Sequence, residues 1–180
     1  MSEPEYLAKV QFITGIGAFT VAAHLKRAPH SAAYFLGDVD AGVFDGTSIF
    51  RVVKASQPPP KRSPIEVVQL GQVSMDERLA PSIQHETTAM TGIHHLKTTV
   101  SLARFAPGAV YHSFFVCMRD EPGLDYGGSR NVDRQGFAAF GLIIDGFDRI
   151  EAMFREWVSD DEYLEHPVPI LTARRLRRRA

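Results

Sequence analysis

Alternating hydrophobic and polar positions run through most of the chain and predict short β strands. From Tyr6 to Leu25 the alternation is interrupted at Gly15 and Gly17, which predicts two strands joined by a hairpin turn. The alternation returns in "SIFRVV", "IEVVQL", "TTVSLARF", "HSFFVCM" and "FAAFGLII", and "VPILTARRL" is a candidate closing strand. Because a strand with one buried face repeats its hydrophobic residues at every second position, the pattern predicts a mainly β protein.

Hydrophobic residues recur at helical spacing in two other places. The first begins at Pro29, a residue that favours the first turn of a helix, and ends near Gly42. The second is "DGFDRIEAMFREWV", with Asp145 or Asp148 near its start as a candidate cap. Its apolar side chains form one stripe of Phe147, Ile150, Met153, Phe154 and Trp157. Two helices are therefore predicted.

The order of these elements predicts one domain over residues 1–180. Strands and helices do not alternate as they do in βαβ units, so we expect an antiparallel barrel or sandwich with two helices packed on it. Four prolines in "KASQPPPKRSP" predict a loop at about 54–64. Residues 71–97 are predicted to have little regular structure. Residues 172–180 are predicted to include a basic tail that is solvated or pairs with the acidic stretch at 160–165.

Composition narrows the class of protein. The formal net charge of −1 gives no global field that would attract nucleic acid. One cysteine, Cys117, permits no intrachain disulfide and suits a reducing compartment. The start has no long apolar segment typical of a signal peptide, and no run reaches the length of a membrane span. We expect a cytoplasmic protein, acting as a monomer, without nucleic-acid or membrane partners.

Several polar residues invite a catalytic or metal-binding interpretation. His85-Glu86 and His94-His95 fit no standard zinc spacing, and their histidines are predicted to be solvated loop residues. Cys117 is predicted to be a small buried residue, and His112 either rims a groove or lies on the plain surface. No metal site and no cofactor are predicted.

Arg51 stands at the centre of an apolar strand, "SIFRVV". Alternation places Ile49, Arg51 and Val53 on one face and Phe50 and Val52 on the other. If the second face goes to the core, Arg51 lies over a groove. The alternative is an arginine whose stem covers apolar surface while its head is in water. The pattern alone leaves both interpretations open.

Five motifs in this chain resemble motifs of the cyclophilins. "AGVFDGTSIFRVV" resembles the segment in which G-x-[YF]-D-G-T precedes F-H-R-V, and "SFFVCM" is similar to the S-Q-F-F-I element. "TTVSLAR", "FAAFGLIIDGFDRIEAM" and "APHSAAYFLGDVDAG" resemble a strand, a strand with the following helix, and the first helix. The matches keep the family's order from about Val10 to Met153. The chain therefore resembles a divergent bacterial cyclophilin.

The resemblance implies a closed eight-stranded antiparallel barrel capped by two α-helices. It also implies peptidyl-prolyl cis-trans isomerase activity on proline-containing segments of client proteins, without metal or cofactor. The family's catalytic arginine corresponds to Arg51, and the phenylalanine at the floor of the proline pocket corresponds to Phe115. The other implied substrate-binding positions are Gln69, Ala103, Arg104, Ser113, Leu124 and Phe137.

The chain also departs from the family's pattern around the implied groove. Phe50 replaces the histidine of F-H-R-V, and Ser113 replaces the glutamine of S-Q-F-F. Glu66 and Val67 stand where two pocket residues would be, and Gly123 stands where some members carry tryptophan. Two hypotheses follow: an isomerase that assists protein folding, or a catalytically weak or inactive peptide-binding module on the same barrel.

Overall fold

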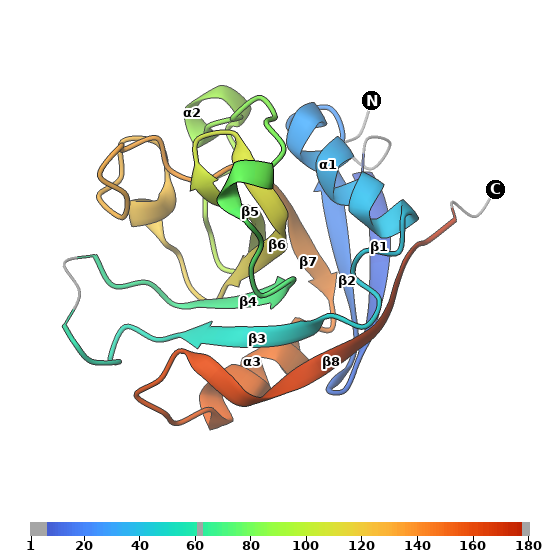
Figure 1. The fold of residues 1–180 in the computed structure, drawn as a ribbon, viewed down its shortest axis with the longest axis vertical. Helices are drawn as coiled ribbons and strands as arrows, with labels where there is room; N and C mark the ends of the chain where they lie inside the picture. Colours follow the sequence, from blue (N-terminus) through green and yellow to red (C-terminus); the bar gives the residue numbers. More distant parts are fainter. Residues whose placement is uncertain (1–6, 61–62, 178–180) are drawn as a thin grey trace.

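Eight antiparallel strands close into a barrel in the computed structural model, which describes residues 7–60 and 63–177 (Figure 1). The order of neighbouring strands is β1-β2-β7-β5-β6-β4-β3-β8. The strands are β1 (Leu7–Thr14), β2 (Gly17–His24), β3 (Ser48–Val53), β4 (Val67–Gly71), β5 (Thr99–Ala106), β6 (Ala109–Cys117), β7 (Ala139–Asp145) and β8 (Tyr163–Arg175). The predicted barrel is confirmed.

The two predicted helices are α1 (Pro29–Asp40) and α3 (Phe147–Glu156), which lie at the upper and lower ends of the barrel in Figure 1. A one-turn helix, α2 (Thr88–Thr91), and a 3-10 turn, η2 (Glu77–Leu79), interrupt the segment expected to be irregular, and a second 3-10 turn, η3 (Pro122–Leu124), follows β6. No helix within the described ranges is long and apolar enough to cross a membrane.

Helix α3 begins without the aspartate cap that the sequence suggested. Its cap position is Gly146, at φ 77°, and no side chain caps the helix. A Cβ on this glycine would lie 2.3 Å from the carbonyl oxygen of Ala18, so the close approach of β2 requires glycine here. Within the predicted apolar stripe, Ile150 is buried, and the other four side chains are half-buried against the core.

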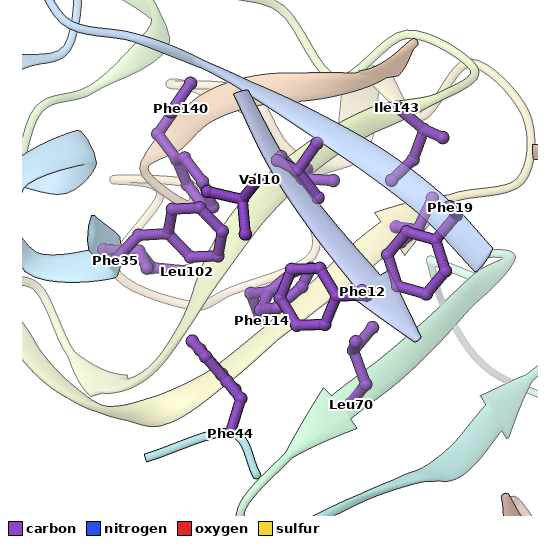
Figure 2. Close-up of a cluster of buried hydrophobic side chains, with 14 of the residues drawn as sticks. Val10, Phe12, Phe19, Phe35, Phe44, Leu70, Leu102, Phe114, Phe140 and Ile143 are labelled. Carbon is purple, nitrogen blue, oxygen red and sulfur yellow. The ribbon is translucent and has the colours of Figure 1, made fainter. Parts of the chain in front are cut away.

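The barrel interior is filled by aromatic side chains (Figure 2). Phe12 stacks on Phe19 with ring centroids 5.0 Å apart, and its edge meets Phe114 at 5.6 Å. Phe35 of α1 closes the end of this cluster against Phe140, at 4.8 Å. Since the side chains fill the interior, a ligand site must lie outside the barrel or at its loops.

Strand β3 departs from the predicted alternation. Its pairing with both β4 and β8 shifts register between Ile49 and Arg51, as at a β-bulge. Ile49 and Val52 therefore belong to the main core, whereas Phe50 stacks on Tyr163 at 6.3 Å. Phe50 is also buried, at 2% exposed, but it lies outside the cluster that holds Val52. The two residues therefore do not share one face as predicted, but Arg51 does face outward.

The basic end of the chain is part of the barrel as far as Arg175, because β8 closes the sheet between β1 and β3. Arg174 pairs with Asp45, and Arg175 pairs with Asp40. The predicted tail at 172–180 thus begins as a strand, and these partners are not in the acidic stretch at 160–165. Residues 178–180 lie outside the described residues.

Residues 54–60 and 63–64 form neither helix nor strand, as predicted for the proline-rich segment, and residues 61 and 62 lie outside the described residues. The loop is held to the barrel by Gln57, which is 4% exposed. Its amide nitrogen donates to the carbonyl oxygens of Val52 and Asp161, so the loop starts from a fixed point beside β3 and β8.

Candidate functional site

A second, smaller hydrophobic cluster lies outside the barrel. Its members are Val53, Ile65, Val67, Phe115, Cys117 and Leu124, with Phe137 packed against them. Phe114 and Phe115 are neighbours on β6, and they point to opposite sides of the sheet because successive strand residues alternate. Phe114 therefore fills the barrel, while Phe115 forms the floor of an outer pocket.

The outer pocket has a volume of about 130 Å³. It is lined by Arg51, Ile65, Val67, Gln69, Ala103, Arg104, Tyr111, Phe115, Leu124, Arg130 and Phe137. Arg51 and Phe115 thus border the same hollow, although they are far apart in the sequence. Seven of the eight residues named from the resemblance line it, and the eighth, Ser113, lies behind Gln69.

The floor of the pocket is aromatic and apolar. Phe137 stands perpendicular to Phe115 with ring centroids 5.2 Å apart. The ring of His95 stacks beside Phe115 at 6.1 Å. Cys117, predicted to be buried, is completely buried, and burial together with nearby carboxylates raises the pKa of its thiol. This floor can accept an aliphatic ring.

Arg51 is held at the pocket edge by strands β3, β4 and β8. Its Nε donates to Oε2 of Glu162 at 2.9 Å, and Nη2 forms an ion pair with the same oxygen. Its Nη1 donates to Oε1 of Gln69 at 3.2 Å, and its guanidinium carbon lies 5.6 Å from the centre of the Tyr163 ring. The side chain remains 27% exposed, so the guanidinium is both oriented and accessible.

Gln69 connects Arg51 to strand β6. Its Nε2 donates to the hydroxyl oxygen of Tyr111 at 2.8 Å and to Oγ of Ser113 at 3.0 Å. Ser113 in turn donates to the carbonyl oxygen of Leu70. Burial raises the pKa of Tyr111, so its hydroxyl stays protonated at neutral pH. Every polar group in this network has a partner, which favours one geometry for Arg51.

Arg104 does not present a free cation to the pocket. Its Nη1 and Nη2 each donate to Asp133 at 2.9 Å, and its Nε donates to the carbonyl oxygen of Gly136 at 2.9 Å. The guanidinium carbon also lies 5.0 Å from the centre of the Phe137 ring. Arg104 therefore fastens the loop after η3 to the barrel and positions Phe137.

The prediction that the three loop histidines, His85, His94 and His95, are solvated is wrong for His95. His95 is 1% exposed and contacts Asp125 at 2.7 Å and Ser101 at 3.0 Å. Glu86 is buried and accepts hydrogen bonds from Ser31 at the start of α1. Among residues 7–60 and 63–177, no cluster of His, Cys, Asp and Glu could hold a metal ion.

His112 lies away from the pocket. Its Nδ1 is 2.8 Å from Oδ1 of Asp38 and 3.2 Å from the hydroxyl oxygen of Tyr34, both on α1. Burial raises the pKa of Asp38, although its contact with His112 opposes this shift. His112 therefore connects β6 to α1 and is not among the residues that line the outer pocket.

Sequence reasoning missed Tyr111, Arg130 and Glu162. Tyr111 shares the outward face of β6 with Ser113 and Phe115, so strand alternation could have identified it. Arg130 comes from the long loop after η3, and Glu162 comes from the turn before β8. Neither of these two carries a local pattern that would place it beside Arg51.

A larger hollow of about 510 Å³ lies between α3 and β8, with Met153, Trp157 and Leu164 among its lining residues. It is wide open to solvent and mainly apolar. It does not combine an oriented cation with an enclosed aromatic floor, so the outer pocket is the better candidate site.

The fold and the site together define a closed β-barrel that carries an oriented arginine beside an aromatic pocket on its outer face. Comparison with protein families identifies the class to which this barrel belongs. Residues 9–175 match the family model described as cyclophilin type peptidyl-prolyl cis-trans isomerase/CLD. The chain belongs to this family, and the predictions of a cyclophilin fold and an isomerase are confirmed.

Two curated relatives come from bacteria. The chain is 29% identical over 143 residues to peptidyl-prolyl cis-trans isomerase A of Dickeya dadantii, covering 77% of this chain and 67% of that protein. It is 28% identical over 152 residues to peptidyl-prolyl cis-trans isomerase cyp18 of Streptomyces antibioticus, covering 82% and 83%. These relatives favour an isomerase over an inactive peptide-binding module.

Solved structures support the same fold. A cyclophilin type peptidyl-prolyl cis-trans isomerase of Cryptosporidium parvum superposes with a TM-score of 0.75 at 15% identity, covering 97% of this chain and 100% of that one. A second structure of that protein, obtained in the presence of the dipeptide Ala-Pro, gives a TM-score of 0.73 at 15% identity, covering 94% and 99%.

Proposed function

We propose that this isomerase accelerates rotation about X-Pro bonds at the outer pocket, with Arg51 as the catalytic residue and Phe115 as the floor for the proline ring. The observation that carries the proposal is that both residues border one cavity. Ala103, Leu124 and Phe137 complete its lining as substrate-binding residues. Gln69 binds beside the substrate and orients Arg51.

The chemistry requires little besides position and charge. The barrier to rotation about a peptide bond is about 18–20 kcal/mol, because rotation breaks the conjugation of the amide. As the bond twists, its nitrogen becomes pyramidal and basic. A fixed donor aimed at that nitrogen stabilises the twisted state more than the planar one, which lowers the barrier. Arginine suits this role because it stays charged and offers several N–H donors in a rigid plane.

The neighbours of Arg51 support this role. Glu162 and Gln69 hold the guanidinium from two sides, so its orientation is set before substrate arrives. A pre-oriented donor does not have to reorganise during the reaction. Arg104 and Ser113, which the resemblance named as substrate-binding, act in this proposal through Phe137 and Gln69, respectively.

We further propose that the substrates are proline-containing segments of client proteins, and that the enzyme acts as a single-domain monomer in the cytoplasm. A similar structure was obtained with Ala-Pro, the smallest such segment. The lone cysteine suits a reducing compartment. Sedimentation velocity and cell fractionation test the monomer and the location; a dimer or an extracytoplasmic protein would contradict them.

The test is NMR exchange spectroscopy on a short Ala-Pro peptide with catalytic amounts of enzyme. We expect faster cis-trans exchange with the wild type and a loss of about 10²-fold in kcat/KM with Arg51→Ala, since one lost transition-state donor typically has this effect. Arg78→Ala is the matched control, because Arg78 is exposed and, within the described residues, forms an ion pair with Asp76 alone. Circular dichroism should show all three proteins folded. Peptide binding without exchange by the wild type would contradict the proposal.

A further inference from the structure

Three arginines surround the outer pocket, but two of them are already neutralised. Arg51 pairs with Glu162, and Arg104 pairs with Asp133. The third, Arg130, has no carboxylate within ion-pair distance among residues 7–60 and 63–177. The pocket lining therefore carries one cation whose charge no neighbouring carboxylate cancels.

Arg130 is fixed in place, although it lies in a loop. Its backbone nitrogen donates to the carbonyl oxygen of Gly123 at 3.1 Å, and its Nη1 donates to the carbonyl oxygen of Ser63 at 3.1 Å. The hydroxyl oxygens of Ser63 and Ser129 lie 2.6 Å apart and join the same two loops. A cation held in this way loses little conformational entropy when it binds a ligand.

The side chain of Arg130 is half-buried and still has donors to offer. Within the described part of the chain, only Nη1 has a hydrogen-bond acceptor, so Nε and Nη2 remain unused. Burial first, and then the charge of Arg51, lower its pKa. The lowered pKa agrees with a cation that an added negative charge would stabilise.

We propose that Arg130 is a specificity-determining residue that binds a carboxylate side chain next to the proline of the substrate. The preferred substrates are then X-Pro segments in which Asp or Glu flanks the proline. This inference rests on the proposed function, because it places the substrate's proline in the outer pocket. A carboxylate suits the site because guanidinium binds its two oxygens in one plane and because it cancels a single positive charge.

The experiment uses two pairs of short peptides that differ only in Glu against Gln, placed before the proline in one pair and after it in the other. For at least one pair, we expect kcat/KM of the wild type at low salt to be about fivefold higher for the Glu peptide than for the Gln peptide. The difference should come from a lower KM. A fivefold effect is about the scale of one partly exposed ion pair. High salt should shrink the ratio. Equal values for Glu and Gln in both pairs would overturn the inference and leave the proposed function standing.

Matched variants locate the effect. Arg130→Gln should bring the Glu-to-Gln ratio of kcat/KM to about one, whereas Arg130→Lys should keep most of the preference for Glu. Arg134→Gln removes the same charge from the same loop, but Arg134 does not line the pocket, so its ratio should match the wild type. If Arg130→Gln still prefers the Glu peptide as strongly as the wild type does, another residue causes the preference and the inference is overturned.

Binding measurements separate this inference from the proposed function. NMR titration of the same peptides measures Kd whether or not exchange is catalysed. If no peptide is isomerised, the proposed function fails, and tighter binding of Glu than Gln that disappears in Arg130→Gln still supports the inference. Equal Kd values for Glu and Gln would then reject it.

Discussion

Phe114 and Phe115 are neighbours on β6, yet they belong to two different regions of the molecule. Phe114 is completely buried in the barrel interior, where it contacts Phe12, Phe35 and Phe44. Phe115 lies on the outer face in the second, smaller cluster, where the rings of Phe137 and His95 pack against it and a cavity remains beside it. The interior is filled and apolar, whereas the outer pocket is partly empty and bordered by arginines.

Strand alternation therefore places the side chains that stabilise this barrel and those of the candidate site on opposite faces of the same strands. Inward side chains gain free energy by filling space, because tight packing and burial of apolar surface stabilise the fold. Outward side chains of β3, β4 and β6 leave a hollow beside a fixed cation, which does little for stability but can hold a substrate. Substitutions in the two regions should therefore have different effects.

The largest expected effect comes from Phe114→Ala. The truncation leaves a cavity inside the barrel and should lower the free energy of unfolding by about 3–5 kcal/mol. Phe115→Ala should cost less stability, because its ring already borders an open hollow, but should remove most isomerase activity. Urea denaturation and NMR exchange measure the two quantities. Equal losses of stability in both variants would contradict the conclusion that Phe114 contributes more to stability than Phe115.

The next effect concerns Asp125, which ties the loop beside the pocket to the barrel. Burial alone would raise its pKa, but hydrogen bonds from the side chain and backbone of His95, and from His94, outweigh this and lower the pKa. Ionised Asp125 therefore stabilises the folded state above its unfolded pKa of about 3.9, and this contribution is lost as the pH falls through the folded pKa.

Asp125→Asn should accordingly lower the free energy of unfolding by about 2 kcal/mol at pH 7, as expected for a buried hydrogen bond to a charged group. The difference from the wild type should shrink as the pH falls below about 4. Denaturation at a series of pH values measures it. Asp76→Asn is the control, because Asp76 is exposed and its one ion-pair partner among residues 7–60 and 63–177 is Arg78. If the difference in free energy of unfolding between the wild type and Asp125→Asn stays constant down to about pH 2, it does not come from the charge of Asp125.

The smallest expected effect is on catalysis alone. Glu162→Gln keeps the shape of the side chain but removes the charge that holds Nε and Nη2 of Arg51. We expect kcat to fall about tenfold, equivalent to about 1.4 kcal/mol, with KM nearly unchanged, because Glu162 positions Arg51 and does not line the pocket. Glu165→Gln, on the adjoining strand β8, is the control. A rise in KM at constant kcat would contradict the positioning role.

Sequence reasoning predicted most of the fold correctly and part of the site. Strand alternation and the order of motifs predicted the barrel, its two main helices and the meeting of Arg51 with Phe115. The bulge at Phe50 was missed because both faces of "SIFRVV" are apolar, so the pattern contains no mark of the extra residue. The burial of His95 was missed because its partners, Asp125 and Ser101, lie outside its own loop.

Local patterns in the amino-acid sequence were enough to locate the strands and the two main helices, and the alternation in β6 separates Phe114 from Phe115. These features depend on residues close together in the chain, so periodicity records them. The three-dimensional structure was needed to see which arginines of the pocket lining are paired with a carboxylate. Glu162 reaches Arg51 across 111 positions and Asp133 reaches Arg104 across 29, while Arg130 meets no carboxylate in the described part of the chain. Ion pairing depends on distance in space, which barrel closure sets and sequence spacing does not reveal.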